Sequence, residues 1–414
     1  MRRIFNGDRT PNLKPVQKIE LSDKNVKIRI VVVIVSVLVA AAAIAFGIRS
    51  CVAAEKGWQV IEAETAKTSC ASEFTFIYNV GNNGGDATVE MRAVKSIYGS
   101  AAINAYLFFD TSADGGELEK INKNTGDDVV IEHALYTALE TMIEKGGRTL
   151  YFAPFYERYE VLFGSDNDGE AAVFDPVKNA DTAALFEKLS TFISDPNSVS
   201  LSLKGNDTVC LDVSDEYKAF AADNDVDSFI GFTWLKNAFI ADYIADYFTE
   251  TGYSSGYIVS REGFYRDLGA AGKSSTKIYF RSGSELYVAC RADNSVIKSG
   301  ASFYDFPMSE GAGYVYENGD TVMPYIDGNG AYKHAVPTMY VYSKSATCAE
   351  TALAAGKIYI DDALDKTAVK SLKNSGVETL YIDGGTIFYT DGDLVVADVL
   401  DANGVTLKKE HLDR

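Results

Sequence analysis

The sequence predicts an α+β protein that follows one apolar segment close to its N-terminus. Two observations indicate that fold class. Apolar residues repeat at helical spacing through much of residues 87–251, and short apolar runs typical of strands follow from Tyr257 onward. No internal repeat or low-complexity linker divides residues 73–414, so we expect them to form a single domain.

Residues 30–48 are the candidate membrane span. They are apolar except for Ser36 and Gly47, and their number falls within the roughly 17–25 residues that cross a bilayer. The leader, residues 1–29, carries eight basic and three acidic residues, so the positive-inside rule places it in the cytoplasm of a bacterial cell and the bulk of the chain outside. A cleaved signal peptide is the competing interpretation, but this leader is long and the apolar run exceeds a typical signal core.

Residues 49–72 are rich in Ala, Thr and Glu, and we expect them to form a flexible juxtamembrane stalk. Cys51 in this segment leaves lipidation open as an alternative form of anchoring. The five cysteines of the chain are scattered and show no metal-site spacing, so the sequence indicates neither a disulfide framework nor a zinc site.

The charge balance excludes one class of partner. The whole chain carries −19 and the leader has an excess of five positive charges, so the remainder carries −24. Such a surface repels nucleic acid and anionic lipid, and we expect no nucleic-acid partner.

Periodicity places the individual elements. Helices are expected around Ala87–Ala102, Ile131–Ile143, Leu185–Ile193, Leu235–Thr251 and Cys348–Gly356. Strands are expected at Phe74–Val80, Tyr257–Val259, Ile278–Phe280, Glu285–Cys290, Met339–Tyr342, Thr379–Ile382 and Leu394–Val399.

Local motifs favour structural roles over catalytic ones. Residues 252–256 fit the G-x-S-x-G pattern of a serine nucleophile, but they follow a helix and precede a strand, the reverse of the order that the nucleophile elbow needs. His334 is the remaining candidate base for such a hydrolase, because His133 lies on a helix face and His411 in the tail. The cluster of Asp361, Asp362 and Asp365 is interpreted as the start of a helix rather than as a magnesium site.

Glu350 has two interpretations. It stands three residues after Thr347, the spacing of a capping box, and its carboxylate is also a ligand type that hard cations prefer. Local sequence favours the cap.

Five segments follow one another in an order that carries more information than any one of them. They are Gly116–Asn122 with the helix after it, Lys236 with its helix and the strand and turn over 256–263, Ser299-Gly300, the turn over 319–327, and the strand 338–341 followed by Thr347–Glu350. Their order, spacing and context resemble those of the ApbE-type FAD:protein FMN transferases from about Trp58 to Val399. The resemblance implies an ApbE-like, T-fold-like domain.

The resemblance also implies a chemistry. Members of that family bind FAD with magnesium at the pyrophosphate and move FMN onto a Ser or Thr hydroxyl of a partner protein, an in-line displacement at phosphorus. At the matching positions, the resemblance implies that Lys236, Ser299, Gly300 and Gly263 bind the cofactor. The resemblance assigns a catalytic role to Asp327 and a metal-ligand role to Glu350.

The sequence departs from the family pattern at several of these points. The glycine loop retains only Gly231 and contains the bulky Phe232 and Trp234, and a Gly-Gly pair reads Glu262-Gly263. The position of a family histidine holds Pro324. Glu350 stands for an aspartate, and Ala354 stands for a hydroxyl residue four positions later.

These departures leave two functions open. One is a degenerate, membrane-anchored relative that binds a flavin or a partner, such as an extracytoplasmic flavoprotein or a surface electron-transfer complex. The other is an active magnesium-dependent transferase that flavinylates extracytoplasmic electron-transfer proteins. Enzymatic activity therefore stays undecided at this point, and FAD and magnesium are implied by the resemblance alone.

Overall fold

The computed structural model describes residues 54–63, 68–269, 274–294, 297–402 and 404–412. Residues Ala54–Arg414 form one compact unit. The predicted leader, residues 1–29, and the predicted span, residues 30–48, lie outside the described residues. Among the helices that are described, none has both the length and the apolar composition of a membrane span.

A nine-stranded sheet organises this unit. Its strands lie in the order β1-β2-β6-β7-β10-β13-β14-β15-β19, and every neighbouring pair is antiparallel except the last. The strands are β1 (Gly57–Ile61), β2 (Phe74–Val80), β6 (Gly256–Ser260), β7 (Phe264–Asp267), β10 (Ser299–Tyr304), β13 (Thr338–Ser343), β14 (Val377–Asp383), β15 (Thr386–Tyr389) and β19 (Lys408–His411).

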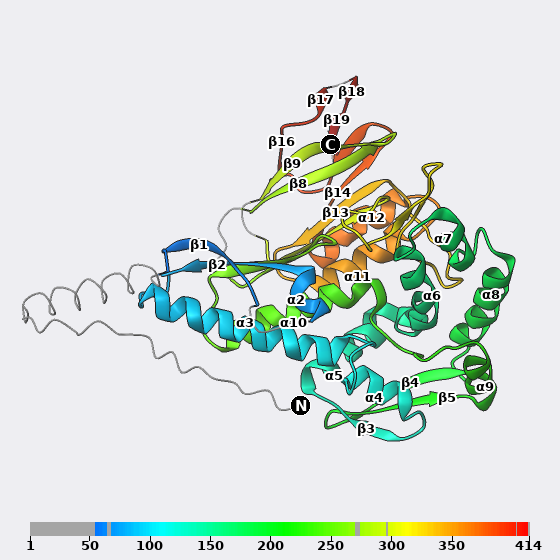
Figure 1. Ribbon diagram of the computed structural model, residues 1–414. Helices are drawn as coiled ribbons and strands as arrows, with labels where there is room; N and C mark the ends of the chain where they lie inside the picture. The colour runs from blue at the N-terminus through cyan, green and yellow to red at the C-terminus, as the bar shows by residue number, and fades with distance from the viewer. Residues whose placement is uncertain (1–53, 64–67, 270–273, 295–296, 403, 413–414) are drawn as a thin grey trace, which may run out of the picture. The chain divides into compact units, whose positions relative to one another are not determined.

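One face of the sheet is covered by helices and part of the other by a smaller sheet (Figure 1). The helical side contains α3 (Ala87–Phe109), α10 (Lys236–Glu250), α11 (Cys348–Tyr359) and α12 (Lys366–Leu372). The smaller sheet contains β8 (Ser274–Ser282), β9 (Glu285–Asn294) and β16 (Val395–Ala397). Every residue of β10 and β13 is buried, because both faces of these central strands are covered.

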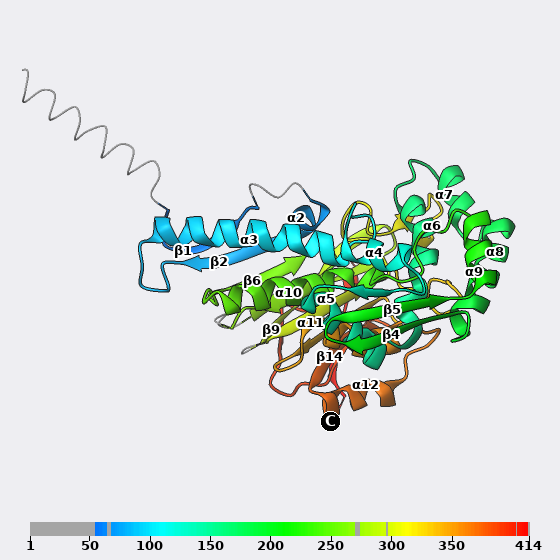
Figure 2. The same cartoon turned by 90° about the horizontal axis from the view of Figure 1, so that it is seen from below.

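A long insertion between β2 and β6 forms a region beside the sheet (Figures 1 and 2). It contains a three-stranded sheet in the order β3-β5-β4. Its elements besides α3 and α10 are α4 (Glu117–Lys123), β3 (Asp128–Val130), α5 (His133–Thr141), α6 (Ala153–Phe163), α7 (Asp168–Phe174), α8 (Ala180–Ser194), β4 (Val199–Gly205), β5 (Thr208–Val213) and α9 (Asp215–Asp223). A π-helix (Met142–Gly146) and a 3-10 helix (Gly147–Phe152) join α5 to α6, and a second 3-10 helix, η3 (Thr233–Leu235), leads into α10.

The described structure confirms the predicted α+β class and most predicted elements. The segment 252–256 is a turn from α10 to β6, as its position after a helix predicted. Asp365 caps α12, and Thr347 and Glu350 form the predicted capping box at the start of α11.

The predicted stalk, residues 49–72, needs correction where the structure describes it. Strand β1 and the start of helix α2 (Ser69–Glu73) lie inside that range. Strand β1 is folded because its backbone pairs with β2, for example Trp58 with Asn79. The sequence did not reveal this strand, because the side chains of Trp58 and Val60 stay exposed and the segment has no clear apolar pattern.

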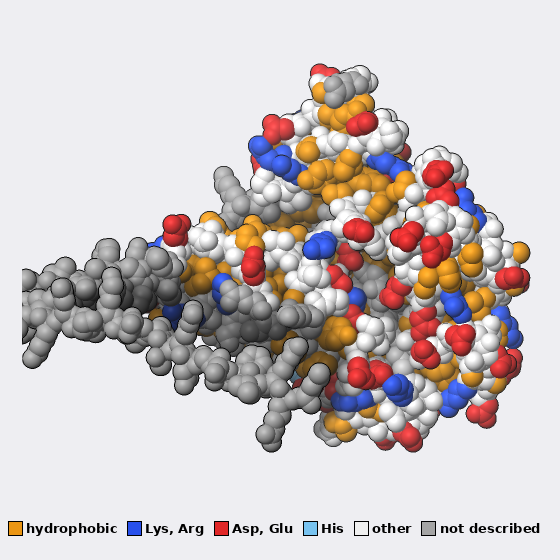
Figure 3. Space-filling view, viewed as in Figure 1, with side chains coloured by type: hydrophobic (Ala, Val, Ile, Leu, Met, Phe, Trp, Pro, Cys, Tyr) orange, Lys and Arg blue, Asp and Glu red, His pale blue; other side chains and the backbone are white. Residues whose placement is uncertain are grey.

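The surface carries the expected acidic character. In the view of Figure 3, Asp and Glu side chains gather over the helices of the insertion, with Lys and Arg scattered among them. This distribution agrees with the strongly negative charge of the sequence after the leader.

Candidate functional site

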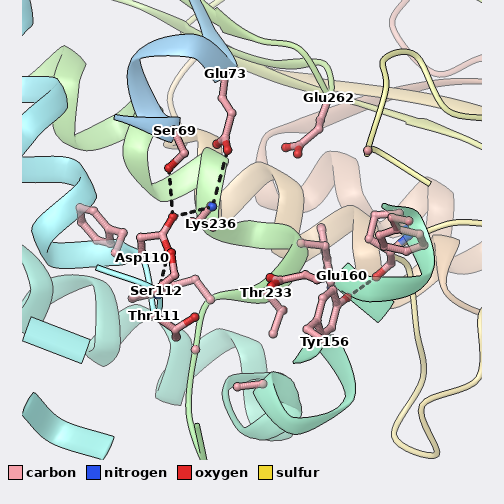
Figure 4. Close-up of a pocket in the computed structure, with 18 of the residues that line it drawn as sticks. Ser69, Glu73, Asp110, Thr111, Ser112, Tyr156, Glu160, Thr233, Lys236 and Glu262 are labelled. Atoms are coloured by element: carbon pink, nitrogen blue, oxygen red, sulfur yellow. Dashed lines mark hydrogen bonds and ion pairs between the residues drawn. The ribbon is translucent and has the colours of Figure 1, made fainter. Parts of the chain in front are cut away.

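A cavity of 370 Å³ lies where the insertion meets the end of the large sheet. Segments far apart in the sequence line it: the end of α2, the end of α3, helix α6, the loop leading into α10 and the turn between β6 and β7 (Figure 4). Six positions that the resemblance singled out line this one cavity: Gly231, Phe232, Trp234, Lys236, Glu262 and Pro324.

Lys236 begins α10 and is held by two carboxylates. Its Nζ lies 3.0 Å from Asp110 Oδ2 and 3.8 Å from Glu73 Oε1. Burial alone would lower the pKa of Lys236, but the attraction of Asp110 and Glu73 outweighs burial and raises it. Lys236 is therefore a charged ammonium already paired within the protein.

Asp110 follows the last residue of α3 and completes this arrangement. Its Oδ1 accepts hydrogen bonds from the backbone N–H and the hydroxyl of Ser112, at 2.9 and 2.6 Å, and Ser69 donates to Oδ2 at 3.4 Å. Burial opposes ionisation of Asp110, yet Lys236 and Ser112 together hold its pKa below the usual value. Asp110 is therefore an ionised partner of Lys236.

Three further carboxylates line the cavity, and at two of them, Glu160 and Glu262, burial raises the pKa more than Lys236 lowers it. Burial raises the pKa of Glu262 to about 7, although Asn237 Nδ2 donates to its Oε2 at 2.7 Å. Burial likewise raises the pKa of Glu157 to about 7, although the backbone N–H of Ser228 donates to it at 2.7 Å. Burial of the carboxyl group raises the pKa of Glu160 against the attraction of Lys236, although the residue as a whole is exposed.

The loop over residues 229–235 occupies the position of the family's glycine loop. It contains bulky side chains, and several of its backbone amides are hydrogen-bonded within the protein. The backbone N–H groups of Phe229 and Ile230 donate to Asn122 Oδ1 at 2.9 and 3.1 Å, and that of Gly231 donates to the carbonyl of Leu150 at 2.9 Å. These amides are therefore unavailable to a phosphate. The segment containing Asn122 was one of the five that carried the resemblance, and here it ties down the loop.

Trp234 fills the space on one side of the same loop. Its six-membered ring lies against α11, where a Cβ on Gly356 would come within 2.5 Å of the indole. Its neighbours include Phe303 and Tyr325, with ring centroids 5.8 Å away in each case. The preceding residue, Thr233, has φ +54°, a strained conformation for a β-branched residue.

Gly263 is required by the backbone. It has φ +102° in the turn between β6 and β7, and a Cβ there would lie 2.8 Å from the Cβ of Ser302. Its neighbour Glu262 reaches the cavity, whereas Gly263 does not line it.

Ser299 and Gly300 lie on β10 beneath the N-terminal part of α11, away from the cavity. Ser299 is fully buried, and its hydroxyl lies 2.9 Å from the carbonyl of Ala346 and 2.8 Å from Thr351 Oγ1. The carbonyl of Gly300 accepts from Cys348 Sγ at 3.6 Å. Both residues therefore help seat α11 on the sheet.

Asp327 and Glu350 are held in local structure. Asp327 Oδ1 accepts from the backbone N–H groups of Asn329 and Ala331 at 2.8 and 3.0 Å and closes a turn. Glu350 forms the capping box with Thr347 and an ion pair with Lys145. Neither residue lines the cavity.

The structure does not place Glu350, the predicted magnesium ligand, in a group of metal-binding side chains. Within the residues that the structure describes, no group of three or more His, Cys, Asp and Glu side chains is arranged to hold a metal ion. At the position of the family histidine, the carbonyl of Pro324 accepts a hydrogen bond from the Tyr156 hydroxyl.

Sequence reasoning missed Asp110, Glu73 and Glu160 as cavity residues. Asp110 lies 126 residues before its partner Lys236, so no local pattern links them. The available signal was an aspartate at the end of a long helix followed by Thr111-Ser112, which is common at helix ends.

No protein-family model matches the sequence, and no curated protein matches it significantly. Solved structures do. The ApbE protein from Thermotoga maritima superposes with a TM-score of 0.53 at 13% identity, over 78% of this chain and 93% of that chain. A flavin transferase ApbE from Vibrio cholerae gives 0.48 at 13% identity over 78% and 93%. The apo form of a flavinyl transferase ApbE from Pseudomonas stutzeri gives 0.48 at 10% identity over 83% and 96%.

The likeness to the Thermotoga maritima protein shows that the chain has an ApbE-like fold. The fold that the order of the sequence segments predicted is therefore confirmed. At this identity, the likeness carries no information about which residues act.

Proposed function

We propose that the protein is a membrane-anchored, extracytoplasmic ApbE-fold binding protein that has lost FMN transfer. The observation that carries the proposal is the loop before α10, whose backbone amides bond to Asn122 and Leu150 and whose neighbours are carboxylates. A phosphate site needs free amides or unpaired cations. In the described lining the amide of Gly231 bonds to Leu150, and the lysine, Lys236, is already paired with Asp110 and Glu73.

The charges reinforce this conclusion. A pyrophosphate in the cavity would face five carboxylates and one lysine, and that lysine is already paired with Asp110 and Glu73. Two like charges 5 Å apart repel by about 3 kcal/mol at an effective dielectric constant of 20. The residues present therefore do not fit the phosphates of FAD.

The fold itself favours the second candidate, an active FAD:protein FMN transferase. Two of the similar structures are named flavin transferases, and Lys236 remains at the head of its helix. Catalysis would require donors for the phosphates and ligands for magnesium, and the residues proposed for those roles, Asp327 and Glu350, are bound up in a turn and a cap.

A transfer assay separates the two functions. The full chain in detergent is mixed with FAD, magnesium and an acceptor protein that carries a flavinylation site, with the Vibrio cholerae flavin transferase as positive control. We expect no covalent flavin fluorescence on a gel and no AMP release. Flavin labelling by the unaltered chain that disappears in Asp327→Ala or Glu350→Ala would show that the protein is an active transferase.

The location of the domain has its own test. Val177 is 82% exposed and the four cysteines in the described structure are buried, so Val177→Cys gives a specific label in a Cys51→Ser background. A membrane-impermeant maleimide should label this variant in intact cells, because the charge of the leader predicts an extracytoplasmic domain. Labelling that needs cell lysis would place the domain in the cytoplasm.

A further inference from the structure

We propose that the cavity beside Lys236 binds a small organic cation, an alkylammonium or diamine. The inference rests on the proposed function, because it assigns the place of the lost flavin to a ligand of opposite charge. Three independent features of the cavity point to that ligand: its charge, its unpaired polar atom and its aromatic walls.

The charge of the cavity is not compensated from within. Lys236 is the one cation among the lining residues, and Asp110 and Glu73 together more than neutralise it. Glu157, Glu160 and Glu262 add carboxylates from α6 and from the turn between β6 and β7. A cation entering the cavity would meet an excess of negative charge on both sides.

One unpaired polar atom shows where a ligand would bind. Glu73 Oε2 is buried and has no hydrogen-bond partner among the described residues. A buried acceptor without a donor costs about 1–3 kcal/mol, which an N–H donor from a ligand would recover.

The walls suit the carbon atoms of an organic cation. Aromatic rings share the lining with the carboxylates: Phe109, Tyr156, Phe163, Phe232, Trp234 and Phe264. An alkylammonium gains from contact with ring faces in addition to its charge, and Trp is the strongest partner of this kind. Among the described residues no three metal-binding side chains are grouped, so an organic cation fits this lining better than a bare metal ion.

The cavity also makes such binding depend on pH. Because burial raises the pKa of Glu262 and of Glu157 to about 7, both are largely neutral at pH 6 and largely ionised at pH 8. Glu73, Asp110, Glu160 and Lys236 are the other charged groups that face them. Cation binding should therefore strengthen from pH 6 to pH 8, by about tenfold if one of these carboxylates contacts the ligand.

The experiment uses the full chain in detergent and measures the thermal midpoint and the heat of binding. The probes are putrescine and choline, with potassium chloride at equal ionic strength as the control and magnesium chloride as a separate arm. We expect a saturable rise in the thermal midpoint with putrescine, choline or both, and none with potassium.

Variants tie the effect to the cavity. Glu160→Gln and Glu262→Gln should each weaken binding by about tenfold, the size of a lost charged contact of 1.4 kcal/mol. Glu187→Gln on α8 is the matched control, since Glu187 is exposed and does not line the cavity. Its affinity should equal that of the unaltered chain.

Three outcomes would overturn the inference: no saturable response to either amine, saturation by magnesium alone, or equal weakening in Glu187→Gln. If the protein binds neither an amine nor FAD, the cation-binding inference is wrong but the proposed function is not contradicted. If the protein binds FAD tightly, the proposed function itself is wrong.

Discussion

Two polar regions of the molecule differ in how their charged groups are paired: one lies where the middle of α10 meets the start of α11, and the other is the cavity at the head of α10. Where α10, α11 and β7 meet, Asp242 accepts hydrogen bonds from the backbone N–H groups of Cys348 and Ala349, both at 2.8 Å, and from Arg266 Nε at 2.8 Å. In the cavity at the head of α10, Glu73 Oε2 is buried without a hydrogen-bond partner among the described residues.

The difference separates structure from function. Asp242 is 8% exposed and Arg266 7%, and together they fix the start of α11 on the sheet. Buried polar groups in proteins are normally paired, so a cavity that leaves a buried carboxylate oxygen unpaired is where we propose that a ligand binds. The junction, in contrast, stabilises the fold.

The largest effect should come from Asp242→Ala. The substitution leaves Arg266 and two helix amides without their partner, and we expect the free energy of unfolding to fall by about 3–5 kcal/mol. Asp246 also pairs with Arg266, at 3.1 Å, but its side chain is 60% exposed. Asp246→Ala should therefore cost about 0–1 kcal/mol. Urea denaturation measures both, and equal losses would mean that the buried Asp242 stabilises the junction no more than the exposed Asp246 does.

The second prediction concerns Glu262 and pH. Burial lifts its pKa in the folded protein from 4.5 to about 7, so the unfolded chain loses this proton at lower pH. Ionised Glu262 consequently opposes folding, and stability falls as the pH rises from about 4.5 to 7. Glu262→Gln should match the unaltered protein near pH 5 and exceed its free energy of unfolding at pH 8 by about 1–3 kcal/mol.

Denaturation at the two pH values tests this expectation, with Glu187→Gln as the control for a lost surface charge. A stability curve for Glu262→Gln that runs parallel to the unaltered one would mean that Glu262 is ionised in the fold at no cost. The cavity would then be well solvated, and burial would not disfavour the ionised form of Glu262.

The smallest effect should come from Glu350→Ala. Because Glu350 completes a capping box and pairs with Lys145, its loss should lower the free energy of unfolding by about 0.5–2 kcal/mol. If Glu350 serves the helix alone, the variant should bind putrescine as the unaltered chain does. Loss of amine binding without loss of stability would give Glu350 a ligand role.

The sequence predicted the parts of the fold that repeat locally. The helix from Lys236 and the strands around Tyr257 and Met339 have strong periodicity, and they appear within a few residues of the expected bounds. The small sheet of β3, β4 and β5 was not expected, nor was β1. These short strands form because a distant partner pairs with them, which no local pattern reveals.

The site was predicted in part. Lys236, Glu262 and Pro324 were singled out from the order of segments, and they share one cavity. Ser299, Gly300, Asp327 and Glu350 lie elsewhere, and the roles that the resemblance implies for them stay predictions. The carboxylates of Glu73 and Asp110 escaped notice, because their meaning depends on Lys236 more than 120 residues away.

Equilibrium dialysis of FAD against the full chain, with and without magnesium, tests the central claim most directly. The backbone amides of Phe229, Ile230 and Gly231 in the loop before α10 are bonded within the protein, and the cavity is acidic. We therefore predict no FAD retained by the protein at concentrations that saturate the Vibrio cholerae flavin transferase measured in parallel. One FAD bound per chain, released by Lys236→Ala, would contradict the proposal and place a flavin in the cavity.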